Sequence, residues 1–260
     1  MLRGFYTAAS GMYAQQRKTD MLTNNMANIN TPGFKEDQAA IRAFPEMLLQ
    51  RIEASSTQTG KVKQIGSLNT GVYMQETLPR FIQGDLQESN LQTDLALSDT
   101  DGRPVFFTVD DNGQSKYTRN GRFTLDGDGL LTTAAGLPVL DVNGNQIRLN
   151  SDQFTVRNNG MIEENGVQIA QLGIAVAENA DSLIKEGDGL FRTENNTPLP
   201  NAGQAFAVAQ GFIEGSTVDA SRSMTEMLTA FRAFEANQKI LQAYDKSMEK
   251  AVNEIGRVNG

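Results

Sequence analysis

The sequence predicts an α+β protein with discontinuous N- and C-terminal α-helices that pair as a coiled coil, and a central, mostly antiparallel β-domain. Three observations lead to this expectation. Both ends of the chain carry apolar residues at helical spacing. Nine Asn-Gly or Asp-Gly pairs lie between residues 101 and 189, and such pairs favour the tight turns of β-hairpins. Short runs rich in β-branched and aromatic residues separate these pairs, as in an all-β body.

Residues 1–30 are expected to form the first helix. Five apolar residues share one stripe of it: Leu2, Phe5, Ala9, Met12 and Met26. Thr31-Pro32-Gly33 then ends the helix, because proline disfavours helical backbone in the residue before it and Pro-Gly suits a tight turn. A second, short helix is expected from Pro45 through Ile52, and residues 55–60 are expected to form a polar linker.

The middle of the chain is expected to contain many short strands. The β-rich runs are residues 105–109, 122–125, 154–157, 167–169 and 173–176. Their spacing and the turn signals between them predict a sandwich or an irregular barrel. No repeat of fixed length is visible in the sequence, so a solenoid or a propeller is not expected.

The last helix is expected over residues 221–257. Ser223-Met-Thr-Glu226 has the pattern of a capping box, and no proline or glycine follows until Gly256. Eight of ten heptad positions are apolar, and they form the expected seam of this helix: Met224, Met227, Phe231, Phe234, Leu241, Met248, Val252 and Ile255.

Each terminal helix has an apolar seam but no partner in its own segment, so we expect the two helices to pair with each other. The alternative is that both helices pack on the β-domain as an ordinary α+β fold. The expected domains are residues 1–66 with 216–260 as the helical domain and linker, 67–94 as a connecting segment, and 95–215 as the β-domain.

Composition excludes several classes of function. The 260 residues include no His, Cys or Trp, so Ser-His-Asp and Cys-His catalysis and zinc sites with Cys or His ligands are impossible. The net charge is −8, and residues 61–215 alone carry 11 basic and 20 acidic side chains, which argues against a nucleic-acid partner. No secretory signal peptide and no transmembrane run is recognisable in the sequence.

Other short patterns do not amount to an active site. Ser182-Leu-Ile-Lys185 and Ser247-Met-Glu-Lys250 match S-x-x-K but lack the further elements that penicillin-recognising enzymes need. The run that begins at Asp126 starts like a calcium loop and lacks its later ligands. We therefore expect no catalytic residue, no cofactor, no metal and no small-molecule substrate.

Four stretches resemble the signatures of bacterial flagellar rod and hook proteins. The longest, residues 24–35, is similar to the pattern N-N-x-A-N-x-N-T-x-G-F-K. Its matching residues are Asn24, Asn25, Ala27, Asn28, Asn30, Thr31, Gly33, Phe34 and Lys35. The other stretches are residues 84–96, the Y-T-R-x-G-x-F run at residues 117–123, and the Q-G-x-x-E-x-S-N-V run at residues 210–218, where Thr217 replaces the usual Asn.

This resemblance implies a structural subunit of the flagellar basal-body rod, of the longer, distal-rod type. Such a subunit would be exported by the flagellar type III apparatus without a cleaved signal peptide. It would polymerise with itself and with other rod and hook subunits into a hollow axial tube that transmits motor torque. The residues in the N-terminal motif and along the C-terminal seam would carry assembly. Two alternatives remain at this point: a secreted glycan-binding or hydrolytic β-domain with helical tails, and an adhesin-like trimer.

Overall fold

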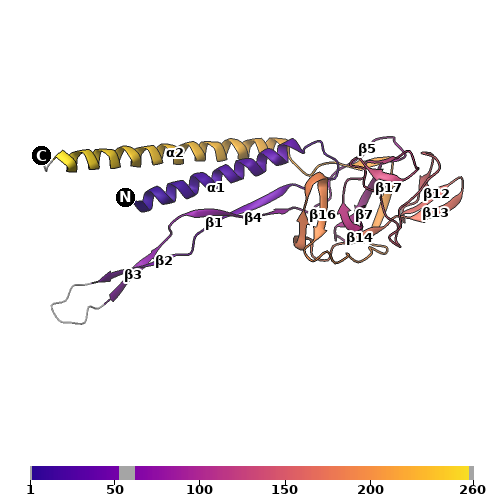
Figure 1. Cartoon of the computed structure of the whole chain (residues 1–260), viewed down its shortest axis with the longest axis horizontal. Coiled ribbons are helices and arrows are strands. Elements are labelled where there is room, and N and C mark those ends of the chain that lie inside the picture. The colour runs from indigo at the N-terminus through magenta and orange to yellow at the C-terminus, as the bar shows by residue number, and fades with distance from the viewer. Residues whose placement is uncertain (1, 53–61, 258–260) are drawn as a thin grey trace. The chain divides into compact units, whose positions relative to one another are not determined.

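The computed structural model of the chain describes residues 2–52 and 62–257. Its contacts divide the chain into two compact units (Figure 1). Unit 1 comprises Met1–Asn24, Gln38–Thr77 and Ser221–Gly260, and unit 2 comprises Asn25–Asp37 and Leu78–Ala220. The domain boundaries expected from the sequence stay a prediction; the contacts group residues 25–37 and 78–94 with the β-strands.

Unit 1 contains the two long helices, α1 (Leu2–Ala27) and α2 (Ala220–Arg257), which lie side by side in Figure 1. The helix α2 covers the residues expected from the sequence but begins three residues before Ser223. The Ser223 side chain is therefore inside the helix, 1% exposed, and its Oγ has no hydrogen-bond partner among the described residues. The expected capping box is wrong for this reason. Within the described residues, neither helix is long and apolar enough to cross a membrane.

A two-stranded ribbon completes unit 1. Strand β1 (Asp37–Ala43) pairs with β4 (Val72–Pro79), and β2 (Met47–Ile52) pairs antiparallel with β3 (Val62–Leu68). The short helix expected from Pro45 is wrong, because Met47–Ile52 is a strand whose backbone bonds to a segment further along the chain. The linker expected at residues 55–60 lies outside the described residues.

The ribbon is tied to α1 by two hydroxyl groups. The Thr7 Oγ1 donates to the Thr70 carbonyl at 2.9 Å, and the Ser10 Oγ accepts from the Val72 N–H at 3.2 Å. Gly71 lies between these contacts, and a Cβ there would come within 2.4 Å of the Ser10 Oγ. Glycine at this position therefore lets the ribbon approach the helix closely.

Unit 2 is a body of short, mostly antiparallel strands, as the turn pattern predicts. Its largest sheet has the order β14-β7-β8-β16-β15, and smaller sheets are formed by β6 with β17, β5 with β18, β9 with β10, and β11-β12-β13. The strands are β5 (Leu86–Glu88), β6 (Leu95–Asp99), β7 (Val105–Asp111), β8 (Gln114–Thr118), β9 (Phe123–Leu125), β10 (Leu131–Thr133), β11 (Thr155–Val156), β12 (Met161–Glu164), β13 (Val167–Gln171), β14 (Ile174–Val176), β15 (Leu183–Lys185), β16 (Leu190–Thr193), β17 (Phe206–Gln210) and β18 (Phe212–Glu214).

Strand β7 is buried on both of its faces. Phe107 belongs to the main core and packs edge-to-face on Phe123, with ring centroids 5.0 Å apart. Its neighbour Phe106 points to the opposite face and joins a second, aromatic cluster with Phe81 and Phe191. Both Phe106 and Phe107 are fully buried. Unit 2 thus holds a complete core on each side of this strand.

Candidate functional site

The N-terminal motif spans the last turn of α1 and the loop after it, and its own asparagines hold it. The Asn25 side chain donates to the Asp37 carbonyl at 2.9 Å and accepts from the Asp37 N–H at 3.0 Å. It is fully buried, so both of its polar atoms depend on these bonds. The Asn28 Oδ1 accepts from the Thr31 hydroxyl at 3.1 Å. These side chains close the loop between α1 and β1, as expected of asparagines at a helix end.

Gly33 in this loop meets the Y-T-R motif. Its φ is 67°, and a Cβ there would lie 2.5 Å from the carbonyl carbon and oxygen of Arg119. Its N–H donates to the Glu214 carbonyl at 2.8 Å. Only glycine therefore fits this position, and three of the four stretches that carry the family resemblance come together around it.

The centre of the site is the Glu214 carboxylate at the end of β18. Its Oε1 accepts from the Lys35 Nζ at 2.7 Å and from the Gly84 N–H at 2.7 Å, and its Oε2 accepts from the Arg119 Nε. The Arg119 guanidinium also binds the Asp99 Oδ1 at 2.7 Å and the Val105 carbonyl. We call Lys35, Asp99, Arg119 and Glu214 the charged cluster.

The positive and negative charges of the charged cluster are equal in number, and its side chains are almost completely buried. It contains two cations and two carboxylates, and Lys35, Arg119 and Glu214 are each at most 2% exposed. Burial lowers the pKa of Lys35, the repulsion of Arg119 adds to the lowering, and the Glu214 carboxylate opposes it. A buried charge is tolerated only when partners replace its water, so each member depends on the others.

A second lysine secures the same loop from β15. The Lys185 Nζ contacts both Asp37 carboxylate oxygens at 2.9 Å and lies 3.9 Å from the centre of the Phe34 ring. Lys185 is the lysine of an S-x-x-K pattern, yet the Ser182 hydroxyl donates to the Asn179 carbonyl at 2.7 Å. Both side chains therefore make structural contacts within unit 2.

Thr217, the departure from the family pattern, also has a defined role. Its Oγ1 accepts from the Glu36 N–H at 2.9 Å, and its own N–H donates to the Phe34 carbonyl at 3.1 Å. The threonine thus joins the segment that precedes α2 to the N-terminal motif. The hydroxyl supplies an acceptor for a backbone N–H in a region that is otherwise buried.

Sequence reasoning found the motifs but not the charged cluster. Arg119 and Glu214 lie inside the motifs of the family resemblance but were not predicted to be site residues. Asp37 and Asp99 were not predicted either, and Lys185 was noted only as part of an S-x-x-K pattern. One signal was available in the sequence. Three motifs made mostly of uncharged residues contain charged side chains of opposite sign, namely Lys35, Arg119 and Glu214. The Y-T-R run at residues 117–123 crosses between two sheets, because β8 and β9 belong to different sheets and Arg119 lies in the connection between them.

The predicted seam of α2 divides between two faces of the helix. Met227, Phe234, Leu241 and Met248 are half-buried, whereas Met224, Phe231 and Val252 are 59%, 52% and 71% exposed. The side chain of Ile255 is not among those that the structure describes. The two fully buried positions of the helix are Ser223 and Ala230, among the residues whose burial is described.

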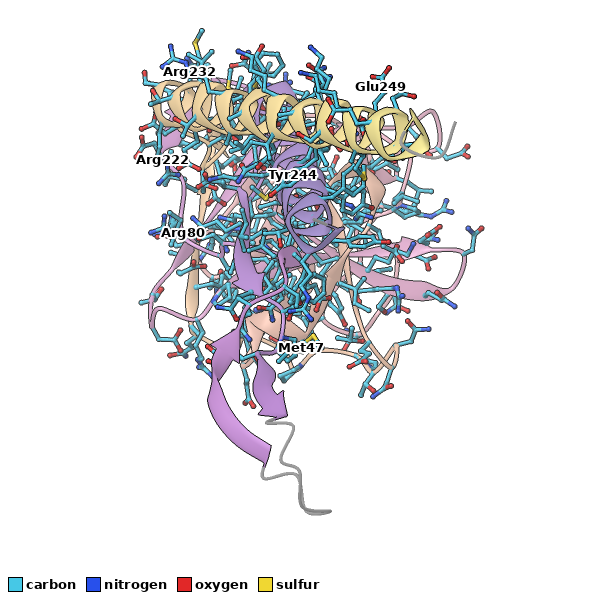
Figure 2. All side chains as sticks on the ribbon, turned by 90° about the vertical axis from the view of Figure 1, so that its left-hand side faces the viewer. Met47, Arg80, Arg222, Arg232, Tyr244 and Glu249 are labelled. Atoms are coloured by element: carbon cyan, nitrogen blue, oxygen red, sulfur yellow. The ribbon has the colours of Figure 1, made fainter. Side chains whose placement is uncertain are left out.

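The contacts between α1 and α2 use small and polar residues. Residues 223, 230, 237 and 244 are seven apart and share one face of α2. A Cβ added at Gly4 would lie 2.0 Å from the Tyr244 hydroxyl, so a side chain there would collide with it. A Cβ added at Gly11 would lie 3.1 Å from the Asn237 side-chain nitrogen. Figure 2 shows Tyr244 between the two helices, with Arg232 and Glu249 on the outer side of α2. The knobs-into-holes packing of a coiled coil stays a prediction.

The stripe predicted for α1 is likewise displaced. Phe5, Ala9 and Met12 are half-buried, while the buried apolar residues of α1, among those whose burial is described, are Ala8, Ala14 and Leu22. Lys18 forms an ion pair with Glu226 of α2 at 3.3 Å. Small residues on the inner face allow the helices to approach each other, and this leaves larger apolar side chains further outward.

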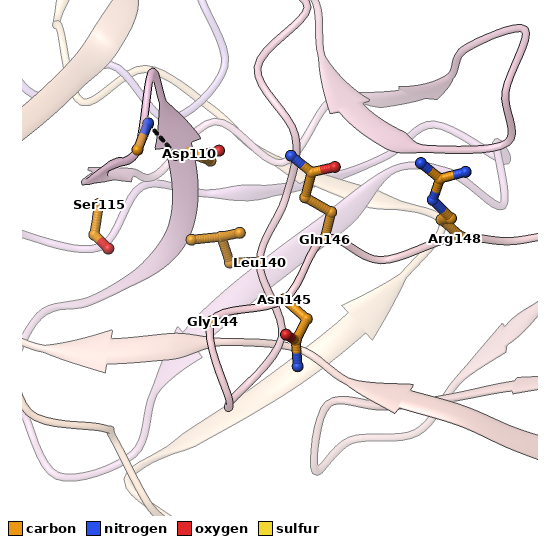
Figure 3. A pocket seen from close by; sticks show the side chains of 8 residues that line it. Asp110, Ser115, Leu140, Gly144, Asn145, Gln146 and Arg148 are labelled. Atoms are coloured by element: carbon orange, nitrogen blue, oxygen red, sulfur yellow. Dashed lines mark hydrogen bonds between the residues drawn. The ribbon is translucent and has the colours of Figure 1, made fainter.

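Unit 2 also has an open, polar pocket of about 540 Å³, shown in Figure 3. Its lining includes Asp110, Ser115, Asn145, Gln146 and Arg148 around the single apolar side chain of Leu140. The Asp110 carboxylate already accepts from the Gly113 N–H at 2.9 Å. No aromatic ring lines this pocket, so it lacks the stacking surface that the glycan-binding alternative would need.

Three family descriptions match separate parts of the chain. The flagella basal body rod protein family matches residues 5–35, the flagellar hook protein FlgE/F/G D1 domain matches 101–190, and the flagellar basal body rod FlgEFG protein C-terminal region matches 209–254. The first and last of these contain Lys35 and Glu214, and the middle one contains Arg119. The charged cluster therefore links all three matched regions.

Whole-length relatives agree with these matches. The flagellar hook-basal body complex protein FlhO of Bacillus subtilis is 43% identical over 99% of this chain and 100% of its own length. The flagellar basal-body rod protein FlgG of the same organism is 33% identical over 97% of this chain and 99% of its own length. The rod protein FlgF of Caulobacter vibrioides is 30% identical over the whole of both chains. The chain therefore belongs to the flagellar basal-body rod and hook family, and it is a structural protein of that family.

Proposed function

We propose that this protein is a subunit of the basal-body rod that assembles with copies of itself and with other rod and hook subunits through its terminal helices. One observation carries the proposal. Met224, Leu228 and Phe231 are spaced i, i+4, i+7 on α2, so they share one face, and each is more than half exposed. We call these three residues the α2 patch. An apolar stripe of this kind marks a protein–protein surface.

A second feature of α2 supports assembly. Val252 lies 18 residues after Phe234, which is five helical turns, so both side chains point to the same face. Phe234 is half-buried, but Val252 is 71% exposed. Gly4, in the first turn of α1 as the structure describes it, lies opposite Tyr244, and Val252 lies eight residues further along α2. A helix from another subunit would continue this pairing.

The proposed assembly is a hollow axial tube in which the pairing of α1 and α2 extends into a coiled coil. The N-terminal motif, Asn24 to Lys35, and the seam of α2 would contribute to it, with the α2 patch added to the residues that the sequence nominated. In unit 2 the charged cluster holds the segments that lead to α1 and to α2 against one body. Torque would therefore be carried without relative movement of these two segments.

Two parts of this proposal rest on family membership alone. They are export through the flagellar type III apparatus without a cleaved signal peptide and a location in the basal body of the flagellum. A place in the distal part of the rod likewise stays a prediction. The relatives are named as rod and hook-basal body proteins, which supports the location.

The substitution Phe231→Asp tests the assembly surface. The side chain is 52% exposed, so we expect the isolated protein to keep its circular dichroism and its unfolding temperature. Burial of an unpaired carboxylate in an assembled tube is costly, so incorporation into basal bodies and swimming should be lost. The measurement is antibody detection of the variant in purified basal bodies, together with motility, in cells that lack the normal copy.

Ala236→Asp is the matched control, because it adds the same charge at an exposed position of α2 outside the patch. It should be incorporated normally. Normal incorporation and motility of the Phe231→Asp variant would exclude the α2 patch as an assembly surface.

A further inference from the structure

We propose that Asn165 is a site of spontaneous deamidation and reacts faster than the other Asn-Gly pairs of unit 2. In this reaction the Gly166 main-chain nitrogen loses its proton to hydroxide and attacks the side-chain carbonyl carbon of Asn165. The new N–Cγ bond forms, the Cγ–Nδ2 bond breaks, and ammonia leaves. Water then opens the cyclic imide to aspartate or isoaspartate.

Unit 2 contains five Asn-Gly pairs, and most of them are held in ways that oppose this attack. The attacking nitrogen must give up its proton, so a hydrogen bond from the glycine N–H slows the reaction. Such bonds run from Gly113 to the Asp110 Oδ1 at 2.9 Å, from Gly144 to the Asp141 carbonyl at 3.0 Å, and from Gly160 to the Arg157 carbonyl at 2.8 Å. Gly121 is buried against the Leu95 carbonyl.

Two of these pairs form a matched comparison. Asn112-Gly113 joins β7 to β8, and Asn165-Gly166 joins β12 to β13, each as a two-residue turn between paired strand ends. The φ angles are 55° and 83° in the first turn and 51° and 79° in the second. All four residues are exposed. The backbone and the solvent access of the two turns are therefore alike.

The two turns differ in their hydrogen bonds. The Asn112 Nδ2 donates to the Asp111 Oδ1 at 2.8 Å, and the Gly113 N–H is bound to Asp110. Among the described residues, neither the Asn165 side chain nor the Gly166 N–H has such a bond. Both reacting groups are therefore free only in the second turn. Release of one hydrogen bond of ordinary net strength corresponds to about a fivefold increase in rate.

Deamidation would change the tip of the β12–β13 hairpin in two ways. It adds one negative charge beside Glu163 and Glu164, which immediately precede Asn165 in the chain. The isoaspartate product also adds one methylene group to the main chain, in a turn that has room for only two residues. The modification is therefore a change of charge and of turn geometry at a defined surface of unit 2.

The test is incubation of the full-length protein at mildly alkaline pH, followed by peptide mass spectrometry with fragment-ion localisation. We expect Asn165 to convert about fivefold faster than Asn112 in the folded protein. In concentrated urea the two sites should convert at similar rates, because both are Asn-Gly. Asn259, which lies outside the described residues, is scored separately.

Asp110→Ala provides the matched variant, because it removes the acceptor of the Gly113 N–H. It should accelerate conversion at Asn112 and leave Asn165 unchanged, while Asn165→Gln should abolish the signal from the β12–β13 turn. Equal rates at Asn112 and Asn165 in the folded protein, or a faster rate at Asn112, would overturn the proposal. So would an Asp110→Ala variant in which conversion at Asn112 is not accelerated.

Discussion

Unit 2 and the helices of unit 1 bury their side chains to very different extents. In unit 2 large residues such as Leu95, Phe106 and Phe107 are completely buried. In α2 the fully buried positions, among residues 220–254, are the small residues Ser223 and Ala230, while Phe231 is 52% exposed. Unit 2 therefore completes its core within one chain. The helices keep large apolar side chains in solvent, which is the expected state of a surface that another subunit covers.

The ion pairs of the two units show the same contrast. The Lys35–Glu214 pair joins atoms 2.7 Å apart in side chains that are 2% and 1% exposed. The Lys18–Glu226 pair between α1 and α2 has a distance of 3.3 Å and side chains that are 30% and 43% exposed. Breaking a buried ion pair strongly destabilises the fold, whereas an exposed ion pair contributes little to stability. The buried ion pair therefore contributes more to the stability of unit 2 than the exposed pair contributes to the contact between α1 and α2.

The largest expected effect comes from Glu214→Gln. It leaves Lys35 and Arg119 buried without their shared carboxylate, so the free energy of unfolding of unit 2 should fall by about 3–5 kcal/mol. The control is Glu163→Gln, which weakens an ion pair to Arg157, whose side chain is 61% exposed. That change should cost about 0–1 kcal/mol. Urea unfolding followed by circular dichroism measures both, and equal losses would refute a special role for the charged cluster.

A smaller effect is expected from Gly33→Ala. At a φ of 67° any residue with a Cβ lowers the free energy of unfolding by about 1–2 kcal/mol. The new Cβ at residue 33 must also displace the Arg119 backbone. Gly102→Ala shares the positive φ, but no atom lies within 4 Å of its added Cβ. We expect Gly33→Ala to be the more destabilising by about 1–3 kcal/mol, the usual cost of overpacking. Chemical denaturation of the two variants decides this, and a Gly102→Ala variant as unstable as Gly33→Ala would contradict it.

Local signals in the sequence predicted much of the fold. The expected helix over residues 221–257 is observed as Ala220–Arg257, and the run at residues 105–109 is strand β7. Where pairing partners are distant, the local signal failed: Met47–Ile52 has a helix-like start at Pro45 but pairs with Val62–Leu68. Part of the predicted seam of α2 is exposed, because hydrophobicity alone does not reveal that small residues, such as Ala230, are the buried ones.

The charged cluster could be predicted only in part. The glycine, lysine and asparagines of the N-terminal motif were nominated, and the structure shows why they are needed. The partner of Lys35 is 179 residues away, and nothing local to either residue specifies that pairing. The requirement that buried charges be balanced applies to the folded chain as a whole. The pairing of these charges can be recognised only once the fold has put the strands β6, β8 and β18 in place.

The central claim is that unit 2 is complete in one chain and that the helices of unit 1 are completed by other subunits. Amide hydrogen exchange of the isolated protein and of the same protein in purified rods tests it most directly. We predict slow exchange in β6, β7 and β17 in both samples, and fast exchange in α2 that becomes slow only in the rod. Equal protection of α2 in the isolated protein and in the rod would contradict the account.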